Sequence, residues 1–223
     1  HYFGCITELD EQVGRLQKKL KELGVYENTL QFFTSDNGPE GGEPKNNQTR
    51  RAGITGGFKG RKRALYDGGL RVPSLVIWPG KVKAGTEIKT AASTLDYLPT
   101  IAKIVGYKMP DSRPIDGMDM MPIVLGESTS RAKAIPLRTQ NLAGIVKGKY
   151  KLLTQSLNGK KDELYDLSAD WQEKTNLASS NPEIVSELKK EIKAFLDSAE
   201  KSHSGADYGS SDYEPVEKFQ KLK

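Results

Sequence analysis

The chain has 223 residues, of which 36% are hydrophobic and 28% are charged, with a formal net charge of +5 at pH 7. This length allows one sizeable core or two small ones, and no run of about 18 apolar residues predicts a membrane span. The basic residues are interleaved with acidic ones and no aromatic-and-basic RNA-binding motif occurs, so the positive charge does not indicate nucleic acid as a partner.

The first predicted element is an amphipathic helix over residues 6–23, followed by Gly24 as its C-cap. Together with the strand that comes next, it predicts one αβ unit of a layered sheet. The apolar residues recur at alternating spacings of three and four, which places them on a single stripe of the helix: Ile6, Leu9, Val13, Leu16, Leu20 and Leu23.

A short apolar and aromatic run, residues 30–35, predicts a buried strand that ends immediately before Asp36, Asn37 and Gly38. Open α/β sheets bind ligands beyond the carboxyl ends of their strands. Asp36 offers a carboxylate and Asn37 an amide oxygen, which are hard donors suited to Ca²⁺ or Mg²⁺. Because Ca²⁺ takes about six to eight oxygens, further ligands must come from elsewhere. The alternative interpretation is a simple turn after a strand.

A long loop rich in Gly, Pro and Asn, residues 38–57, leads to a basic segment in which Lys62 is flanked by glycines. Glycine allows a backbone to approach a ligand closely, and a lysine ammonium is a point charge suited to an oxyanion. Lys62 is therefore a candidate for substrate binding and catalysis. Asp67 and Arg71 are four residues apart, and we expect them to form a structural ion pair that fixes the turn.

Three segments of this region together resemble the type I sulfatase family: Thr34-Ser35-Asp36-Asn37-Gly38, Gly60-x-Lys62, and Asp67-Gly68-Gly69-x-Arg71-Val72-Pro73. Shorter matches continue to the C-terminal part of the chain, in the order that the family has. That family hydrolyses sulfate monoesters on an alkaline-phosphatase-like α/β fold. The resemblance implies that Asp36 and Asn37 coordinate a calcium ion and that Lys62 binds the substrate sulfate.

The resemblance covers only part of the family's active site. The family's nucleophile is a formylglycine made from Cys or Ser in a Cys-x-Pro-x-Arg segment, and the single cysteine here, Cys5, lacks that context. The family's paired metal-binding aspartates, catalytic histidine and second active-site lysine are also missing. The two histidines present, His1 and His203, have no partner at metal-binding or catalytic-triad spacing. We therefore expect the C-terminal part of a sulfatase, whose formylglycine and remaining calcium ligands belong to a missing N-terminal part of the same protein.

The rest of the chain predicts a second strand over residues 74–78 and a helix with Asp96 as its N-cap and Ile101, Ile104 and Val105 on its apolar face. Short segments then predict a small antiparallel sheet over residues 135–138, 144–146, 150–154 and 164–167, with a turn at 147–148. Pro182 is expected to begin a helix, with an apolar face formed by Ile184, Leu188, Ile192 and Phe195.

These elements predict an α/β fold: part of an alkaline-phosphatase-like sulfatase sheet over residues 1–128, an antiparallel-sheet and helix subdomain over 129–201, and a polar tail over 202–223. The implied activity of the full-length protein is calcium-dependent hydrolysis of a sulfated small molecule or, more specifically, a sulfated glycan. Two alternatives stay open: a phosphatase or phosphonate hydrolase of the same superfamily, and a non-catalytic carbohydrate-binding or interaction module. By resemblance alone, the protein is expected to be periplasmic or secreted.

Overall fold

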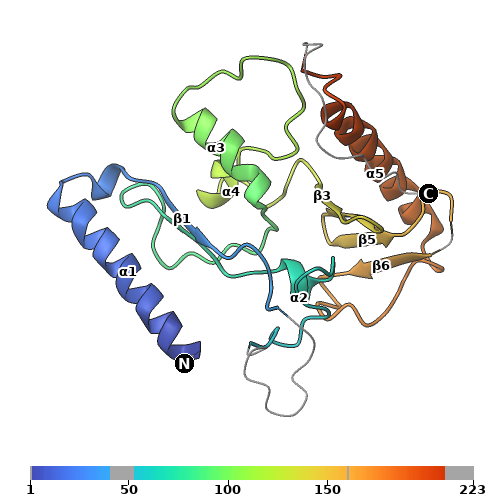
Figure 1. Cartoon of the computed structure of the whole chain (residues 1–223), viewed down its shortest axis with the longest axis horizontal. Helices are drawn as coiled ribbons and strands as arrows, with labels where there is room; N and C mark the ends of the chain where they lie inside the picture. Colours follow the sequence, from blue (N-terminus) through green and yellow to red (C-terminus); the bar gives the residue numbers. More distant parts are fainter. Residues whose placement is uncertain (1, 41–52, 160, 209–223) are drawn as a thin grey trace.

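The computed structural model describes residues 2–40, 53–159 and 161–208 (Figure 1). Among these residues, none of the helices combines the length and the apolar content that a membrane span requires. In chain order the elements are α1 (Tyr2–Glu22), η1 (Tyr26–Asn28), β1 (Gln31–Thr34), α2 (Asp67–Leu70), β2 (Ser74–Ile77), η3 (Thr94–Asp96), α3 (Tyr97–Ile104), α4 (Met121–Val124), β3 (Ile135–Arg138), β4 (Ala143–Lys147), β5 (Tyr150–Thr154), β6 (Asp162–Asp166) and α5 (Pro182–His203).

The strands form two antiparallel sheets. β1 pairs with β2, with Gln31 opposite Ile77, and the second sheet has the order β3-β4-β5-β6. The predicted antiparallel sheet is therefore confirmed. Its β4–β5 turn lies one residue later than predicted, at Gly148 and Lys149, because Lys147 still pairs with Tyr150.

One face of the four-stranded sheet packs against α5, as the sequence predicts. Ile145, Leu152 and Leu164 from the strands are at most 3% exposed, and so are Leu188 and Ile192 from the helix. Side chains alternate along a strand, so the neighbours of these strand residues point to the opposite face. That opposite face is directed toward the segment around α2 (Figure 1).

The N-terminal sheet packs one face against α4 and the start of α3. Phe32 of β1 stacks on Tyr97 with ring centroids 4.4 Å apart, and Val76 of β2 joins the cluster around Met121 and Val124. The strand that the sequence predicts to be buried is only partly buried at each of its four residues.

Two predicted apolar helix faces remain largely exposed. Leu16 of α1 is 54% exposed, and Leu23, directly after that helix, is 61% exposed. Ile101 of α3 is 44% exposed, and its C-cap Val105 is 68% exposed. The helices form where the periodicity predicts them, but these apolar residues do not enter a core among the described residues. An apolar stripe of this kind normally faces a core or a partner surface.

Asp96 occupies the N-cap position of α3, as the sequence predicts, but its side chain does not cap that helix. Its carboxylate accepts hydrogen bonds from the backbone amides of Ser93 at 2.8 Å and Met118 at 2.9 Å. Both terminal nitrogens of Arg131 bind the carboxylate at 2.6 Å, and Asp96 is completely buried. Burial alone would raise the pKa of Asp96, but Arg131 and the two amides hold that pKa below its ordinary value.

This pair gives a stability prediction. Replacing Arg131 with Met leaves the Asp96 charge buried without its partner, which should lower the free energy of unfolding by about 3–5 kcal/mol. Because the folded-state pKa of Asp96 is depressed, the stabilisation is fully present above the unfolded-state pKa of about 4 and is lost as the pH falls through the folded-state pKa. Urea unfolding of the full-length protein between pH 7 and pH 2 measures both effects.

The control is Asp111→Asn, which removes a solvent-exposed pair with Arg113 and should leave the urea midpoint unchanged. An Arg131→Met midpoint equal to that of the wild type would show that the buried pair is not needed for stability.

Candidate functional site

Asp36 and Asn37 directly follow β1, at the place that the sequence predicts. Asp36 is exposed, and within residues 2–40, 53–159 and 161–208 its carboxylate has neither a hydrogen-bond partner nor an ion-pair partner. The side-chain amide of Asn37 donates to the Gly38 carbonyl at 2.9 Å, which leaves its amide oxygen as the atom available to a ligand. Two hard oxygens fit part of a calcium site. Across the described residues, no group of three or more His, Cys, Asp or Glu side chains forms a complete metal site.

Lys62 lies on a loop that runs beside the segment after β1. Its backbone amide donates to the Pro39 carbonyl at 3.1 Å, and the amide of Gly38 donates to the Gly69 carbonyl at 2.9 Å. The Lys62 ammonium is 3.6 Å from the Glu40 carboxylate, and the lysine side chain is 36% exposed. The structure therefore places the candidate metal ligands and the candidate sulfate-binding lysine on adjoining segments.

The glycines of this region allow backbone to pack directly on backbone. A Cβ atom on Gly38 would lie 1.9 Å from the Gly68 carbonyl oxygen, one on Gly68 would lie 2.2 Å from the Gly60 oxygen, and one on Gly69 would lie 2.3 Å from the Ala64 oxygen. The sequence suggested that such glycines admit a ligand. In the structure, Gly38, Gly68 and Gly69 serve to bring three segments of the chain into contact.

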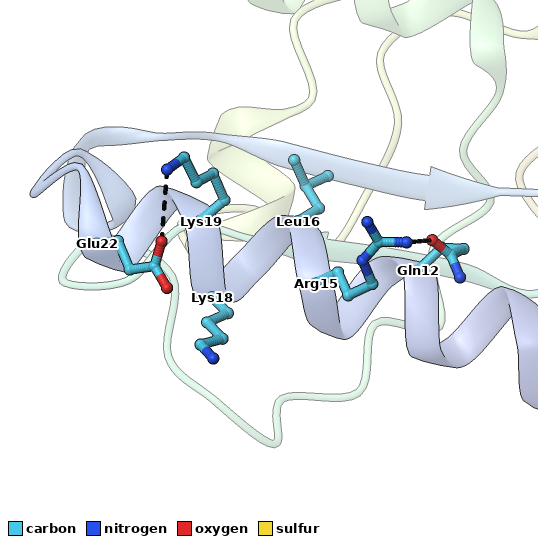
Figure 2. Close-up of a pocket in the computed structure, with 6 residues that line it drawn as sticks. All are labelled: Gln12, Arg15, Leu16, Lys18, Lys19 and Glu22. Carbon is cyan, nitrogen blue, oxygen red and sulfur yellow. Dashed lines mark hydrogen bonds and ion pairs between the residues drawn. The ribbon is translucent and has the colours of Figure 1, made fainter.

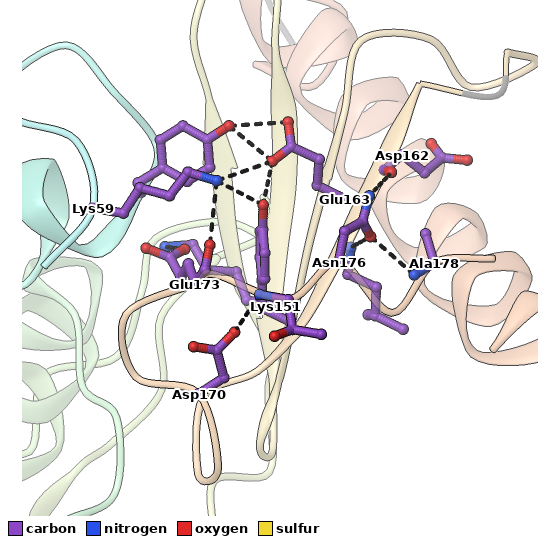
Figure 3. A network of polar contacts seen from close by, with 12 residues as sticks. Lys59, Lys151, Asp162, Glu163, Asp170, Glu173, Asn176 and Ala178 are labelled. Atoms are coloured by element: carbon purple, nitrogen blue, oxygen red, sulfur yellow. Dashed lines mark hydrogen bonds and ion pairs between the residues drawn. The ribbon is translucent and has the colours of Figure 1, made fainter. Parts of the chain in front are cut away.

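Asp67, at the start of α2, is held mainly by a residue that the sequence did not indicate. The predicted pair with Arg71 is long, 3.9 Å, and the Arg71 side chain is 58% exposed. The close partner is Lys151 of β5, whose ammonium lies 2.7 Å from Asp67 and 2.9 Å from Glu173. Figure 3 shows Lys151 beside Glu173. The Glu173 carboxylate also accepts a hydrogen bond from the Asp67 backbone amide at 2.7 Å.

A second set of contacts surrounds Lys59, which is not available to a ligand in the way that Lys62 is. The Lys59 ammonium donates to the Tyr165 hydroxyl at 2.8 Å and lies 3.5 Å from the Glu163 carboxylate. The Tyr66 hydroxyl donates to Glu163 at 2.8 Å, and burial together with this hydrogen bond raises the pKa of Tyr66 to about 12. Burial opposes ionisation of Glu163, but the hydroxyls of Tyr165 and Tyr66, with Lys59, keep its pKa below the ordinary value.

Sequence reasoning missed Lys151 and Glu173, and only Lys151 carries a weak signal in the sequence. Lys151 is a single charged residue inside an apolar strand, and a lysine is almost never fully buried unless it is paired. Glu173 has φ 55°, a conformation that is uncommon for residues other than glycine and costs free energy. That conformation is visible only in the structure.

A shallow hollow also lies on the surface of α1 (Figure 2). Its walls come from this one helix, and Lys19 and Glu22 form an exposed ion pair across it. It is separate from the segments that carry Asp36 and Lys62, so we assign no ligand to it. The lining residues are Gln12, Arg15, Leu16, Lys18, Lys19 and Glu22.

The candidate site thus consists of adjoining loops that carry a pair of hard oxygen donors and a lysine, on an α/β fold. The sequence matches the family described as Sulfatase over residues 1–107 and the family described as N-sulphoglucosamine sulphohydrolase, C-terminal, over residues 56–200. The chain belongs to the sulfatase family, as its motifs predict.

Three relatives illustrate the similarity. Steryl-sulfatase of Rattus norvegicus is 40% identical over 125 residues, which cover 56% of this chain and 22% of the relative. Arylsulfatase A of Homo sapiens is 34% identical over 226 residues, covering 87% of this chain and 43% of the relative. N-acetylgalactosamine-6-O-sulfatase of Bacteroides thetaiotaomicron is 33% identical over 201 residues, covering 82% of this chain and 39% of the relative. The chain thus spans less than half the length of each of these relatives.

Solved structures share the fold. A structure from work on the metabolism of multiple glycosaminoglycans by Bacteroides thetaiotaomicron superposes with a TM-score of 0.71 at 28% identity, covering 84% of this chain and 42% of that one. A phosphonate monoester hydrolase of Agrobacterium radiobacter superposes with a TM-score of 0.61 at 24% identity, covering 90% of this chain and 40% of that one. The predicted α/β fold is confirmed, and it occurs in enzymes whose names indicate different ester substrates.

The close backbone packing predicts a sharp difference between two glycine substitutions. Gly68→Ala places a Cβ atom against the Gly60 carbonyl and should destabilise the protein by about 1–3 kcal/mol, as overpacking does. Gly14→Ala, in the interior of α1 with no atom within 4 Å of the added carbon, should be neutral or stabilising by up to about 1 kcal/mol. Urea unfolding compares the two, and equal midpoints for both variants would contradict the tight junction around α2.

Proposed function

We propose that the full-length protein hydrolyses sulfate monoesters and that its substrates are sulfated carbohydrates. The observation that carries this proposal is the backbone junction at Gly38, where main-chain hydrogen bonds join the Asp36–Asn37 segment to the segments of Lys62 and Gly69. Membership of the sulfatase family supports the reaction. The relative named N-acetylgalactosamine-6-O-sulfatase supports the substrate class.

In this proposal Lys62 binds a sulfate oxygen and neutralises the charge that develops on the leaving oxygen. Oriented positive groups act most strongly where charge grows in the transition state. Asp36 and Asn37 would supply two of the oxygens that hold Ca²⁺, and the bound ion would supply charge stabilisation at the sulfate. These two ligands are too few for a calcium site alone, so the proposal assigns the other ligands and the formylglycine nucleophile to residues outside this chain.

The same proposal assigns a partner to the exposed apolar faces of α1 and α3. We expect these faces to be covered, and the site to be completed, by a part of the full-length protein that corresponds to the length of the relatives outside this chain. The 223-residue chain alone should therefore be inactive. The resemblance to exported sulfatases also leads us to propose a periplasmic or secreted location.

A phosphatase or phosphonate hydrolase is the rival activity, because the fold also occurs in a phosphonate monoester hydrolase. Sulfate and phosphate esters share their shape and differ in charge. Turnover by the full-length protein of aryl sulfate, aryl phosphate and aryl phosphonate substrates with the same leaving group separates the two activities. Faster turnover of the phosphorus esters would overturn the proposal.

The role of Lys62 is tested by Lys62→Ala in the full-length enzyme. Removing the ammonium should lower kcat on an aryl sulfate by about 10²–10³-fold, the range found when one electrostatic donor to a transition state is removed. The control is Lys83→Ala, which removes an exposed lysine from another loop and should leave kcat unchanged. Wild-type turnover by Lys62→Ala would show that the lysine has no catalytic role.

The metal proposal predicts that removal of calcium abolishes turnover. Treatment with a chelator should eliminate activity of the full-length enzyme, and added Ca²⁺ should restore it. Asp36→Asn should require a higher Ca²⁺ concentration for half-maximal activity, since it replaces a charged ligand with a neutral one. Glu87→Gln, at an exposed position outside the site, should keep the wild-type concentration. Activity that survives chelation and the Asp36 substitution would contradict calcium binding here.

A further inference from the structure

Lys151 is an unusual residue for the middle of a strand. It is 0% exposed, and so is Glu173, while Asp67 is 7% exposed. Burying several charges carries a large desolvation cost, and apolar residues of similar volume often replace such groups without loss of stability. Stability is therefore a weak explanation for this arrangement, and a role in fixing one particular geometry is the better one.

The contacts of Lys151 lead directly to the candidate site. Its ammonium binds the Asp67 carboxylate at 2.7 Å, and Asp67 begins the turn that contains Gly68 and Gly69. The Gly68 amide donates to the Lys59 carbonyl at 2.7 Å, and the Gly69 carbonyl accepts from the Gly38 amide at 2.9 Å. One face of β5 is thus connected, through α2, to the segment before Lys62 and to the segment after Asp36.

Glu173 fastens the same loop at a second point. Its carboxylate accepts from the Asp67 amide, and its backbone carbonyl accepts from the Lys59 ammonium at 3.3 Å (Figure 3). Both ends of the segment over residues 59–67, which carries Lys62 and is called the Lys62 loop below, therefore reach one residue. Burial raises the pKa of Glu173, and Lys151 acts against that shift. Two buried carboxylates can stay close to each other only with a cation between them, and Lys151 is that cation.

We propose that Lys151 is a positioning residue: acting through Asp67 and Glu173, it fixes the Lys62 loop against the Asp36–Asn37 segment from the C-terminal sheet. Its effect on turnover rests on the proposed function, whereas its effect on the backbone of the loop does not. The residue acts at a distance from any substrate and makes the spacing between the two halves of the site depend on the neighbouring sheet. Misplacement of reacting groups by about 1 Å can cost about 10²-fold in rate.

The test is Lys151→Met in the full-length protein, which retains a long side chain and removes the charge. Amide hydrogen exchange should become about tenfold faster or more at Gly38, Lys62 and Gly68, while the buried α5 amides of Leu188 and Ile192 keep wild-type protection. On an aryl sulfate, kcat should fall by about 10²-fold, with a smaller change in KM. The matched control is Lys149→Met, two residues away, which removes an ammonium on a side chain that is 53% exposed and pairs with Asp166; it should change neither measurement.

If Lys151→Met does not fold, Glu173→Gln is the second variant. It keeps the shape of the side chain and removes one of the two carboxylates. Wild-type exchange at Gly38, Lys62 and Gly68 in the variant that folds would overturn the positioning role. Faster exchange spread equally through α5 would also overturn it, since that result indicates general destabilisation. If the wild-type enzyme does not turn over sulfate esters but Lys151→Met still loosens only the loop, then the proposed function fails and the positioning role stands.

Discussion

The arrangement of the candidate site depends on one buried cation between two carboxylates. The loop over residues 59–71 carries little apolar surface: Leu65 is its only hydrophobic side chain in the buried core of the described chain. Hydrophobic packing, which is non-directional, cannot hold such a segment in one conformation. The directional contacts of Lys151, Asp67 and Glu173 can do so, because each one fixes an angle as well as a distance. Once α2 is placed, the glycines allow the other two segments to pack against it.

The four-stranded sheet has two different functions on its two faces. Leu152 and Leu164 point to α5 and form the hydrophobic core of the C-terminal region. Lys151 and Tyr165, which are opposite each other in the register, point to the other face and bind the loop. The alternation of side chains along β5 therefore couples the stability of the C-terminal core to the geometry of the site. A one-residue shift of that strand would exchange the two faces.

Local patterns predicted the elements well, and long-range contacts were not predictable in the same way. The period of apolar residues predicted β5 and α5, and the family motifs singled out Lys62. The Lys151–Asp67 pair joins residues 84 positions apart, and the Asp96–Arg131 pair spans 35 positions. No local spacing rule relates such partners, so Asp96 was interpreted from its nearest helix, as a cap. The exposure of Leu16 is a further case, because periodicity predicts an apolar face but not what covers it.

The three lysines near the site show that exposure alone does not decide which cation can bind a substrate. Lys59 and Lys62 have nearly equal side-chain exposure, 38% and 36%, whereas Lys151 has none. The Lys59 ammonium lies within 4.9 Å of the ring centroids of both Tyr66 and Tyr165, in addition to its polar partners, so displacing it would break many contacts at once. Lys62 has an ion pair with Glu40, a carboxylate that is itself 51% exposed. Pairs as exposed as this are worth about 0–1 kcal/mol, so exchange of Glu40 for another anion, such as the proposed sulfate, would cost little. The number of partners to be broken, more than burial, makes Lys62 the lysine available for an anion.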